Sequence, residues 1–379
     1  KDKGITLIAL VITIIILLIL AGISISALTN QGLFKNAKAA QNATEKAEKE
    51  QGQRLNEYED EINKYLNNAN EDEKIGLITD NINKELSKTD NTKLKDEKGN
   101  RIVVPAGFKI VNGATTVDKG IVIEDVTETA TKGSQFVWIP VGTITKSDGT
   151  TATITLGRYD FDSTTGKESA YSGSYIEEDT NDASTLKKWG NTIAKNITKF
   201  KNSVATNGGY YIGRYEARTA TARNAAGNAL TQITEKGTEN VYNYVTQLQA
   251  AQLSQNMYNS DKFTSDLMNS YAWDTATVFI QNCGTNAKYS RQNSLNTALL
   301  QTGTNSLTDT SKIDVQCNIY DMASNIEEWT TETSYDSDSP CVYRGGYCIS
   351  SNVFTSNRSN SYTSGRGNVG FRPLLYVNV

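Results

Sequence analysis

A run of apolar residues near the N-terminus, GITLIALVITIIILLILAGI (4–23), constrains the fold of this chain more than any other feature. No charged residue occurs from Ile5 to Leu28, and about 20 such residues in a helix span about 30 Å, the thickness of a bilayer core. Lys1 and Lys3 precede the run, which predicts a cytoplasmic N-terminus and an exported remainder. A retained anchor or assembly helix is favoured over a cleaved signal peptide, because the run is long and no A-x-A site ends it.

The first residues also carry a family resemblance. K-x-K-G followed by I-T-L-I resembles the leader and first helix of type IV pilins and pseudopilins. The resemblance implies cleavage after Gly4, a new N-terminus at Ile5 and a helix that packs in the core of a filament. Pilins usually carry Glu at the fifth mature position, where this chain has Ala9, and this departure favours an unprocessed subunit or a plain anchor. The side chains expected to assemble or enter a membrane are Ile5, Leu7, Ile8, Leu10, Ile12, Ile15, Leu18 and Leu20.

A second helical pattern, over residues 31–68, predicts an amphipathic stalk after the hydrophobic segment 1–30. A bend is expected at 30–32, and Glu, Lys and Gln fill the polar faces. The stalk either lies on the domain behind it or packs against copies of itself. Its apolar stripe recurs at three- and four-residue steps: Ala37, Ala40, Ala43, Ala47, Leu55, Tyr58, Ile62, Tyr65 and Leu66.

Composition excludes several classes of function. The formal charge is −4, and no basic cluster interleaved with aromatic residues is present, so no nucleic-acid partner is expected. The chain has no His, which removes the commonest general base and metal ligand. Its four cysteines, Cys283, Cys317, Cys341 and Cys348, lack zinc-site spacing and fit two disulfides. Three pairings are open, with Cys341–Cys348 and Cys283–Cys317 favoured.

The remaining sequence predicts an α+β fold class: a long N-terminal hydrophobic and amphipathic helix followed by a mixed domain. Residues 69–100 are predicted to be a polar linker with a short helix, and residues 101–379 a globular head. Short β-rich runs bounded by Gly, Pro and Asp begin at Arg101. Helices are predicted over residues 186–201, 242–257 and 265–281, the last with Trp273 and Phe279 on its buried side.

Five ordered sequence blocks in the C-terminal half carry a second resemblance. GGYYIGRYEA (208–217), YAWDTATVFI (271–280), NIYDMASNIEEWT (318–330), YRGGY (343–347) and NVGFRPLLY (368–376) are similar to blocks of the formylglycine-generating-enzyme-like family. This sulfatase-modifying-factor family has a variant of the C-type lectin fold, which the resemblance implies for residues 205–379. Enzymes of the family use two copper-bound cysteines shortly after the RGG strand. Only Cys348 occurs there, so a non-catalytic domain is predicted.

The matched residues imply structural roles. Trp329 and Phe371 are expected in the core, and Arg344 and Arg372 are expected to hold carboxylates or carbonyls. Gly345, Gly346 and Gly370 are expected to provide backbone shapes that a side chain forbids. Asn325 and Glu328 match positions where the family often binds structural Ca²⁺; the alternative is a turn that needs no ion. No other cofactor is expected.

A polar stretch between two of these motifs, residues 347–368, is the candidate binding loop. The chain has 19 Tyr against 9 Phe, and Tyr with Ser, Gly and Asn is typical of adaptable binding surfaces. In C-type-lectin-fold receptors diversified by retroelements, the variable stretch lies in this place; the alternative is a solvated loop. The candidate residues are Tyr347, Asn352, Phe354, Asn357, Arg358, Asn360, Tyr362 and Arg366.

These features predict a bacterial cell-surface protein: a pilin-like filament subunit that displays a non-catalytic lectin-fold head for ligand binding or adhesion. Its partners would be copies of itself through the N-terminal helix, the membrane during biogenesis and an extracellular ligand. Two alternatives remain, a membrane-anchored monomeric receptor or adhesin and a formylglycine-generating-type enzyme. Sequence alone does not name the ligand.

Overall fold

The computed structural model describes residues 3–30, 38, 41–42, 44, 46, 76–77, 82–84, 86–111, 113, 115–179, 196–293, 314–347 and 352–379. The chain divides into two compact units, Lys1–Glu73 and Lys74–Val379. Most of the predicted stalk, residues 31–68, lies outside the described residues, as does Cys348.

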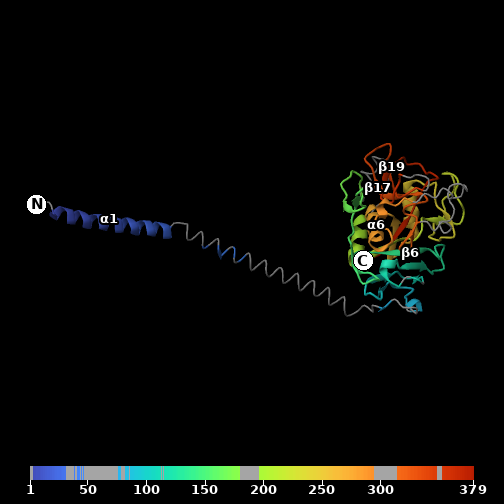
Figure 1. Cartoon of the computed structure of the whole chain (residues 1–379), viewed down its shortest axis with the longest axis horizontal. Helices are drawn as coiled ribbons and strands as arrows, with labels where there is room; N and C mark the ends of the chain where they lie inside the picture. Colours follow the sequence, from blue (N-terminus) through green and yellow to red (C-terminus); the bar gives the residue numbers. More distant parts are fainter. Residues whose placement is uncertain are drawn as a thin grey trace. The chain divides into compact units, whose positions relative to one another are not determined.

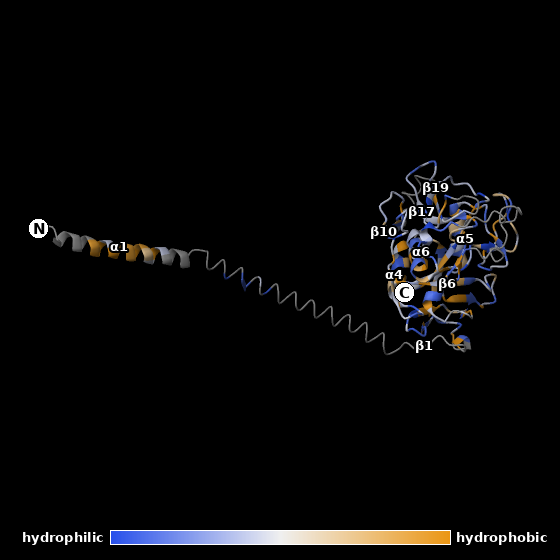
Figure 2. Ribbon diagram, in the orientation of Figure 1, coloured by the Kyte–Doolittle hydropathy of each residue, from blue (hydrophilic) through white to orange (hydrophobic). Residues whose placement is uncertain are grey.

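The N-terminal unit contains α1 (Lys3–Asn30), which is apolar along its middle (Figure 2). Its large aliphatic side chains from Leu10 to Ile23 are 47 to 66% exposed. The helix ends at Asn30, a residue of low helix propensity. Among the described residues, no helix satisfies both the length and the hydropathy required to cross a membrane.

The predicted fold class is therefore wrong. The structure gives bounds for four α helices, α1, α4, α5 and α6, and none forms the long hydrophobic and amphipathic helix that was expected. The C-terminal unit is built mostly of β strands. The reason lies in its sequence, where short β-branched and aromatic runs are interrupted every few residues by Gly, Asn, Asp or Thr, which favour strands and turns over long helices.

A six-stranded antiparallel sheet forms the centre of the C-terminal unit, in the order β14-β21-β11-β6-β5-β4 (Figure 1). The C-terminal strand, β21, lies between β11 and β14, so the last residues of the chain complete the sheet. Tyr211 pairs with Trp138 on one side and with Leu375 on the other. The strands are β4 (Phe108–Ile110), β5 (Val122–Asp125), β6 (Gln135–Pro140), β11 (Gly209–Gly213), β14 (Phe263–Leu267) and β21 (Pro373–Val377).

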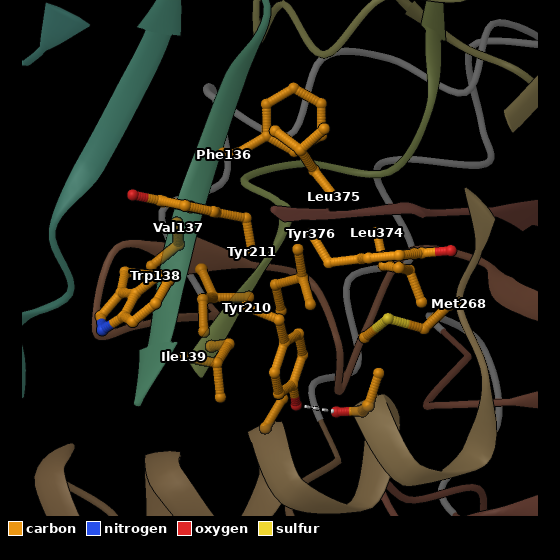
Figure 3. Packing of buried hydrophobic residues seen from close by; sticks show 14 of the residues in the cluster. Phe136, Val137, Trp138, Ile139, Tyr210, Tyr211, Met268, Leu374, Leu375 and Tyr376 are labelled. Carbon is orange, nitrogen blue, oxygen red and sulfur yellow. Dashed lines mark hydrogen bonds between the residues drawn. The ribbon is translucent and has the colours of Figure 1, made fainter. Parts of the chain in front are cut away.

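Aromatic rings fill the core beside this sheet. The ring centroids of Trp138 and Tyr211 are 4.9 Å apart, and those of Phe200 and Tyr210 are 5.2 Å apart, both edge to face. Figure 3 shows Ile139 and Tyr210 on one side of β6, above a helix, and Trp138 on its other side. The Tyr210 hydroxyl donates to the Ala272 carbonyl at 2.7 Å, so its polar end is satisfied inside the core.

Three helices accompany the sheets: α4 (Ile197–Asn207), α5 (Gln247–Met257) and α6 (Ser270–Cys283). Each begins at a side-chain cap, as when the Asn269 side chain accepts from the Ala272 amide at 2.8 Å. The third helix starts later than predicted, because residues 263–267 pair with β21 instead. Trp273 and Phe279 are fully buried on α6, as predicted.

The second sheet gathers three of the family-like blocks. Its order is β19-β18-β17-β20, and the labels β17 and β19 lie together in Figure 1. Glu328 pairs with Arg344 on one side, while Trp329 pairs in parallel with Phe371 on the other. Both aromatic side chains are fully buried, which confirms their predicted core positions. The strands are β17 (Glu327–Thr333), β18 (Cys341–Arg344), β19 (Arg358–Ser361) and β20 (Val369–Phe371).

The segment predicted as a linker, residues 69–100, contributes strands to the C-terminal unit. Its strand β2 (Thr92–Lys95) pairs with β3 (Arg101–Val104), and Leu94 is 1% exposed. Asp96 closes the connecting turn by accepting from the Asn100 amide at 2.8 Å. The other short elements are β1 (Gly76–Leu77), β7 (Gly142–Thr145), β8 (Thr151–Ile154), β9 (Tyr159–Phe161), β10 (Glu168–Ala170), β12 (Arg218–Thr219), β13 (Asn240–Val241), β15 (Val315–Gln316) and β16 (Ile319–Tyr320).

The tight approach of β18 to the segment before β17 requires glycine. A Cβ on Gly346 would lie 2.0 Å from the Ala323 carbonyl oxygen, and Gly345 has φ +94°. This agrees with the role predicted for the RGG block.

We expect Trp329→Ala to lower the free energy of unfolding by about 3–5 kcal/mol, because it leaves a large cavity between β17 and β20. The matched control is Tyr335→Ala, since Tyr335 is 64% exposed; its effect should stay within about 0.5 kcal/mol. Urea denaturation of the full chain followed by circular dichroism measures both. Equal midpoints for the two variants would contradict the assignment of Trp329 to the core.

Candidate functional site

A cavity of about 490 Å³ in the C-terminal unit, here called the aromatic pocket, is lined in part by half of the candidate binding-loop residues. Its walls come from β9, the segment after β10, the residue Arg291 and the segment 352–358. The volume lies within the range of small-ligand sites. The lining residues are Tyr159, Asp160, Phe161, Tyr171, Tyr175, Arg291, Asn352, Phe354, Ser356, Asn357 and Arg358.

The β9–β10 hairpin supplies one wall. Asp160 pairs with Ser169 across the hairpin, and its carboxylate accepts from the Ser172 amide at 2.8 Å. The Tyr171 hydroxyl accepts from the Tyr175 amide at 3.0 Å. These bonds hold Tyr171 and Tyr175 on the same side of the hairpin, facing the cavity.

Beneath the pocket lies a buried ion network, made of three guanidiniums (Arg158, Arg344, Arg358) and two carboxylates (Asp274, Glu332). Arg158 pairs with Glu332 at 2.6 Å, and Arg344 pairs with Asp274 at 2.5 Å. Arg358 bridges both acids, at 3.0 Å from Glu332 and 2.6 Å from Asp274. At the pocket mouth, the Asp160 carboxylate lies 3.9 Å from Arg358 as well, so three acids face the three guanidiniums and their charges balance.

The network shifts the ionisation of its members. Burial alone would raise the pKa of Glu332, but the guanidiniums of Arg358, Arg344 and Arg158 outweigh it and hold that pKa below its ordinary value. Conversely, Asp274 and Glu332 overcome the burial penalty on Arg358 and raise its pKa. Glu332 thus stays ionised at neutral pH, and Arg358 stays charged.

Two of these guanidiniums also clamp an aromatic wall of the pocket. Arg158 lies 4.3 Å and Arg358 lies 4.1 Å from the ring centroid of Tyr171. Cations over an aromatic face attract its negative quadrupole. Tyr171 is consequently fixed by charges that are themselves fixed in the core.

The candidate loop residues separate into two groups. Asn352, Phe354, Asn357 and Arg358 line the aromatic pocket, as the binding-loop hypothesis requires. The others lie elsewhere: Tyr347 is partly buried, the Asn360 side chain donates to the Ser339 carbonyl, and Arg366 lies over Tyr362, which is 58% exposed.

Sequence reasoning missed the other half of the pocket. Tyr159, Phe161, Tyr171 and Tyr175 lie almost 200 residues before the candidate loop. The available signal was the density of Tyr and Gly in RYDFD (158–162) and YSGSY (171–175), which resembles the composition of the loop itself.

The calcium candidates do not present a free ligand set. Glu328 is ion-paired to Arg372 at 2.7 Å, and both side chains are buried. The Asn325 amide group donates to Glu216 at 2.6 Å, while its side-chain oxygen has no hydrogen bond. Across the described residues, no group of three or more Asp, Glu or Cys side chains has an arrangement that could hold a metal ion. The Ca²⁺ site at Asn325 and Glu328 stays a prediction.

One of the two favoured disulfides, Cys283–Cys317, is not formed in the structure. Cys283 and Cys317 are free thiols in the structure, and burial raises the pKa of Cys283 to about 12. The segments that carry these two cysteines are nevertheless in contact, because the Gln316 side-chain oxygen accepts from the Thr285 amide at 2.8 Å. Cys341 is buried on β18, and its proposed partner, Cys348, lies outside the described residues.

A second cavity, of about 360 Å³, is lined by Phe108, Tyr258 and Phe263 together with threonines 127, 129 and 131. Its rings belong to the core aromatic cluster, with Phe108 and Tyr258 centroids 5.6 Å apart. No charged side chain lines it. The aromatic pocket is therefore the better candidate for specific recognition.

Comparison with known proteins gives no family assignment. No protein-family model matches the chain, and no curated protein matches it. Among solved structures, the chain is similar to Treponema denticola variable protein 1, with 12% identity and a TM-score of 0.32 over 65% of this chain and 97% of that one. So weak a likeness carries no inference. The pilin-like and formylglycine-generating-enzyme-like resemblances therefore remain resemblances of sequence motifs.

We expect Glu332→Gln to destabilise the full chain at pH 7 by about 3–5 kcal/mol, because it leaves buried guanidiniums without their partner. A carboxyl with a lowered folded pKa stabilises above its ordinary pKa of 4.5 and loses that contribution as pH falls through the folded value. The gap between the variant and the parent should therefore narrow below pH 4.5.

Urea midpoints at pH 7, 5 and 3 measure this gap. The control is Glu128→Gln, since the Glu128 side chain is 84% exposed. A gap that stays constant with pH would show that Glu332 stabilises by packing and not by charge.

Proposed function

We propose that the C-terminal unit is a non-catalytic binding domain that holds a small ligand, or the terminal group of a larger one, in the aromatic pocket. The observation that carries the proposal is the contact of the Tyr171 ring with two guanidiniums of the buried ion network. Rigid aromatic walls bind at low entropic cost, because few rotors remain to be frozen.

The charges around the pocket favour binding over catalysis. Both buried carboxylates of the network are engaged by guanidiniums, so neither is available as a general base. At the mouth, the Asp160 carboxylate accepts from Ser172 through both its amide and its hydroxyl. The proposed role is therefore recognition.

Display at the bacterial cell surface is part of this proposal. Its support is the N-terminal pattern of Lys1 and Lys3 before a long apolar run, which is typical of exported chains. Cleavage of the C-terminal unit by protease added to intact cells would be the expected result. Full protection on intact cells, with cleavage after lysis, would place the protein inside.

A finer part of the proposal concerns α1. Its aliphatic side chains from Leu10 to Ile23 are exposed on all sides in the single chain. An exposed apolar surface of this kind is stabilised by an apolar cover. We propose a second copy of this helix as the partner, so that copies of the chain associate through α1.

Replacing Tyr171 with Ala should weaken ligand capture at least about ten-fold, because it removes the clamped wall of the pocket. The measurement is retention of the labelled full chain on an array of glycans and peptides, with Tyr335→Ala as the exposed control. Retention that survives Tyr171→Ala on every spot would place recognition outside the aromatic pocket.

For the assembly proposal, Ile15→Asp should abolish association, because it places an unpaired carboxylate in an apolar contact between helices. Analytical ultracentrifugation in mild detergent measures the assembly state, and circular dichroism checks that the C-terminal unit stays folded. Thr13→Ser, a small polar change on the same helix, is the control. Unchanged sedimentation of Ile15→Asp would rule out association through α1.

A further inference from the structure

Arg291 differs from the other arginines at the aromatic pocket. Arg158 and Arg358 are both committed to Glu332. Within the described part of the chain, the Arg291 guanidinium has no ion pair or hydrogen bond and lies over the Phe354 ring, 3.8 Å from its centroid. A guanidinium that lies at the wall of a cavity and forms no ion pair can bind an anion.

The backbone around Arg291 keeps this residue in place at the wall of the pocket. Its backbone amide donates to the Lys288 carbonyl at 2.8 Å, and the neighbouring Ser290 carbonyl accepts from the Ser356 amide at 3.0 Å. The nearby acid, Asp162, forms no ion pair with Arg291 and accepts from the backbone amides of Thr164 and Thr165. The hydrogen bonds from Thr165 and Thr164 lower the pKa of Asp162 most, and the charge of Arg291 lowers it further. Arg291 therefore lies beside the loop 352–358, where its guanidinium N–H groups can donate to a ligand.

The rest of the lining suits a hydroxylated ring. The rings of Tyr159 and Phe161 lie edge to face, with centroids 6.3 Å apart, and Tyr171 forms a further wall. An aromatic face carries negative charge density that attracts the C–H bonds of a saturated ring. Asp160, whose carboxylate is held by Ser172 and Arg358, and three short polar residues complete the lining. The side chains of these three form no hydrogen bond with another described residue: Asn352, Ser356 and Asn357.

We propose that the ligand of the aromatic pocket is a sugar acid, a hydroxylated ring that carries one carboxylate. Its carboxylate pairs with the Arg291 fork, its C–H face lies on the aromatic walls, and its hydroxyls bond to Asn352, Ser356 and Asn357. The inference rests on the proposed function and adds the chemical class of the ligand.

An acidic peptide fits these groups less well. An Asp or Glu side chain offers one carboxylate on a short aliphatic stem, so it would engage Arg291 but leave the amide and hydroxyl groups of the pocket unmatched. Unmatched polar groups that lose water cost free energy. A sugar acid satisfies the cation and the neutral polar groups together.

The test compares methyl glucuronide with methyl glucoside in titrations of the full chain followed by NMR. The two ligands differ only at C6, where the glucuronide has a carboxylate and the glucoside a hydroxymethyl group. Binding of the glucuronide, at least about ten-fold tighter than the glucoside, is expected. Arg291→Gln should remove that preference, and Arg291→Lys should restore part of it, since Lys keeps the charge but not the fork. Arg101→Gln is the matched control, because Arg101 contacts the Thr206 carbonyl and does not line the pocket.

The remaining outcomes separate this inference from the proposed function. Equal binding of glucuronide and glucoside, abolished by Tyr171→Ala, would overturn the sugar-acid assignment and leave the aromatic pocket as a binding site. Binding of an acidic peptide but neither sugar, again dependent on Tyr171, would overturn it in favour of a peptide ligand. Binding that neither Tyr171→Ala nor Arg291→Gln changes would overturn both proposals.

Discussion

The arrangement of the C-terminal unit depends on two buried carboxylates, Asp274 and Glu332. Asp274 lies on α6 and Glu332 lies on β17, while the guanidiniums that neutralise them come from the residue before β9, from β18 and from β19. Asp274 also accepts from the Tyr159 amide at 2.8 Å, which ties β9 to the same point. Loss of one member of such a network leaves a buried charge unpaired. Sequence-distant elements are therefore held together at one charged centre.

The aromatic pocket is the exposed side of that centre. Arg158 and Arg358 satisfy the buried acids with their guanidiniums and, from the same positions, hold the ring of Tyr171. The opposite wall is fixed by backbone bonds, since the Thr355 amide donates to the Gln292 carbonyl at 3.1 Å. A ligand entering the pocket then has little protein motion to arrest, so more of the contact energy appears as affinity.

How much of the fold and of the pocket could be predicted from the sequence depends on how far apart the interacting residues lie along the chain. Trp329, Phe371 and the carboxylate-binding roles of Arg344 and Arg372 were predictable, because each lies in a short block whose residue types already define its role. The start of α6 was predicted wrongly, since residues 263–267 pair with β21, more than 100 residues later. Half of the aromatic pocket was missed for the same reason, because Tyr171 and Phe354 are joined only through the tertiary fold.

The sign of the pocket's charge is a local property that the formal charge of −4 conceals. In a second buried cluster, Glu216, Glu235 and Glu328 outnumber the arginines Arg218 and Arg372, and burial raises the pKa of all three acids. Burial disfavours the charged form of each of these acids, and exposed charges more than about 8 Å apart are largely screened in physiological salt. A ligand at the pocket mouth therefore responds chiefly to the charges that line the pocket, and an acidic protein can still present a cation, Arg291, to an acidic ligand.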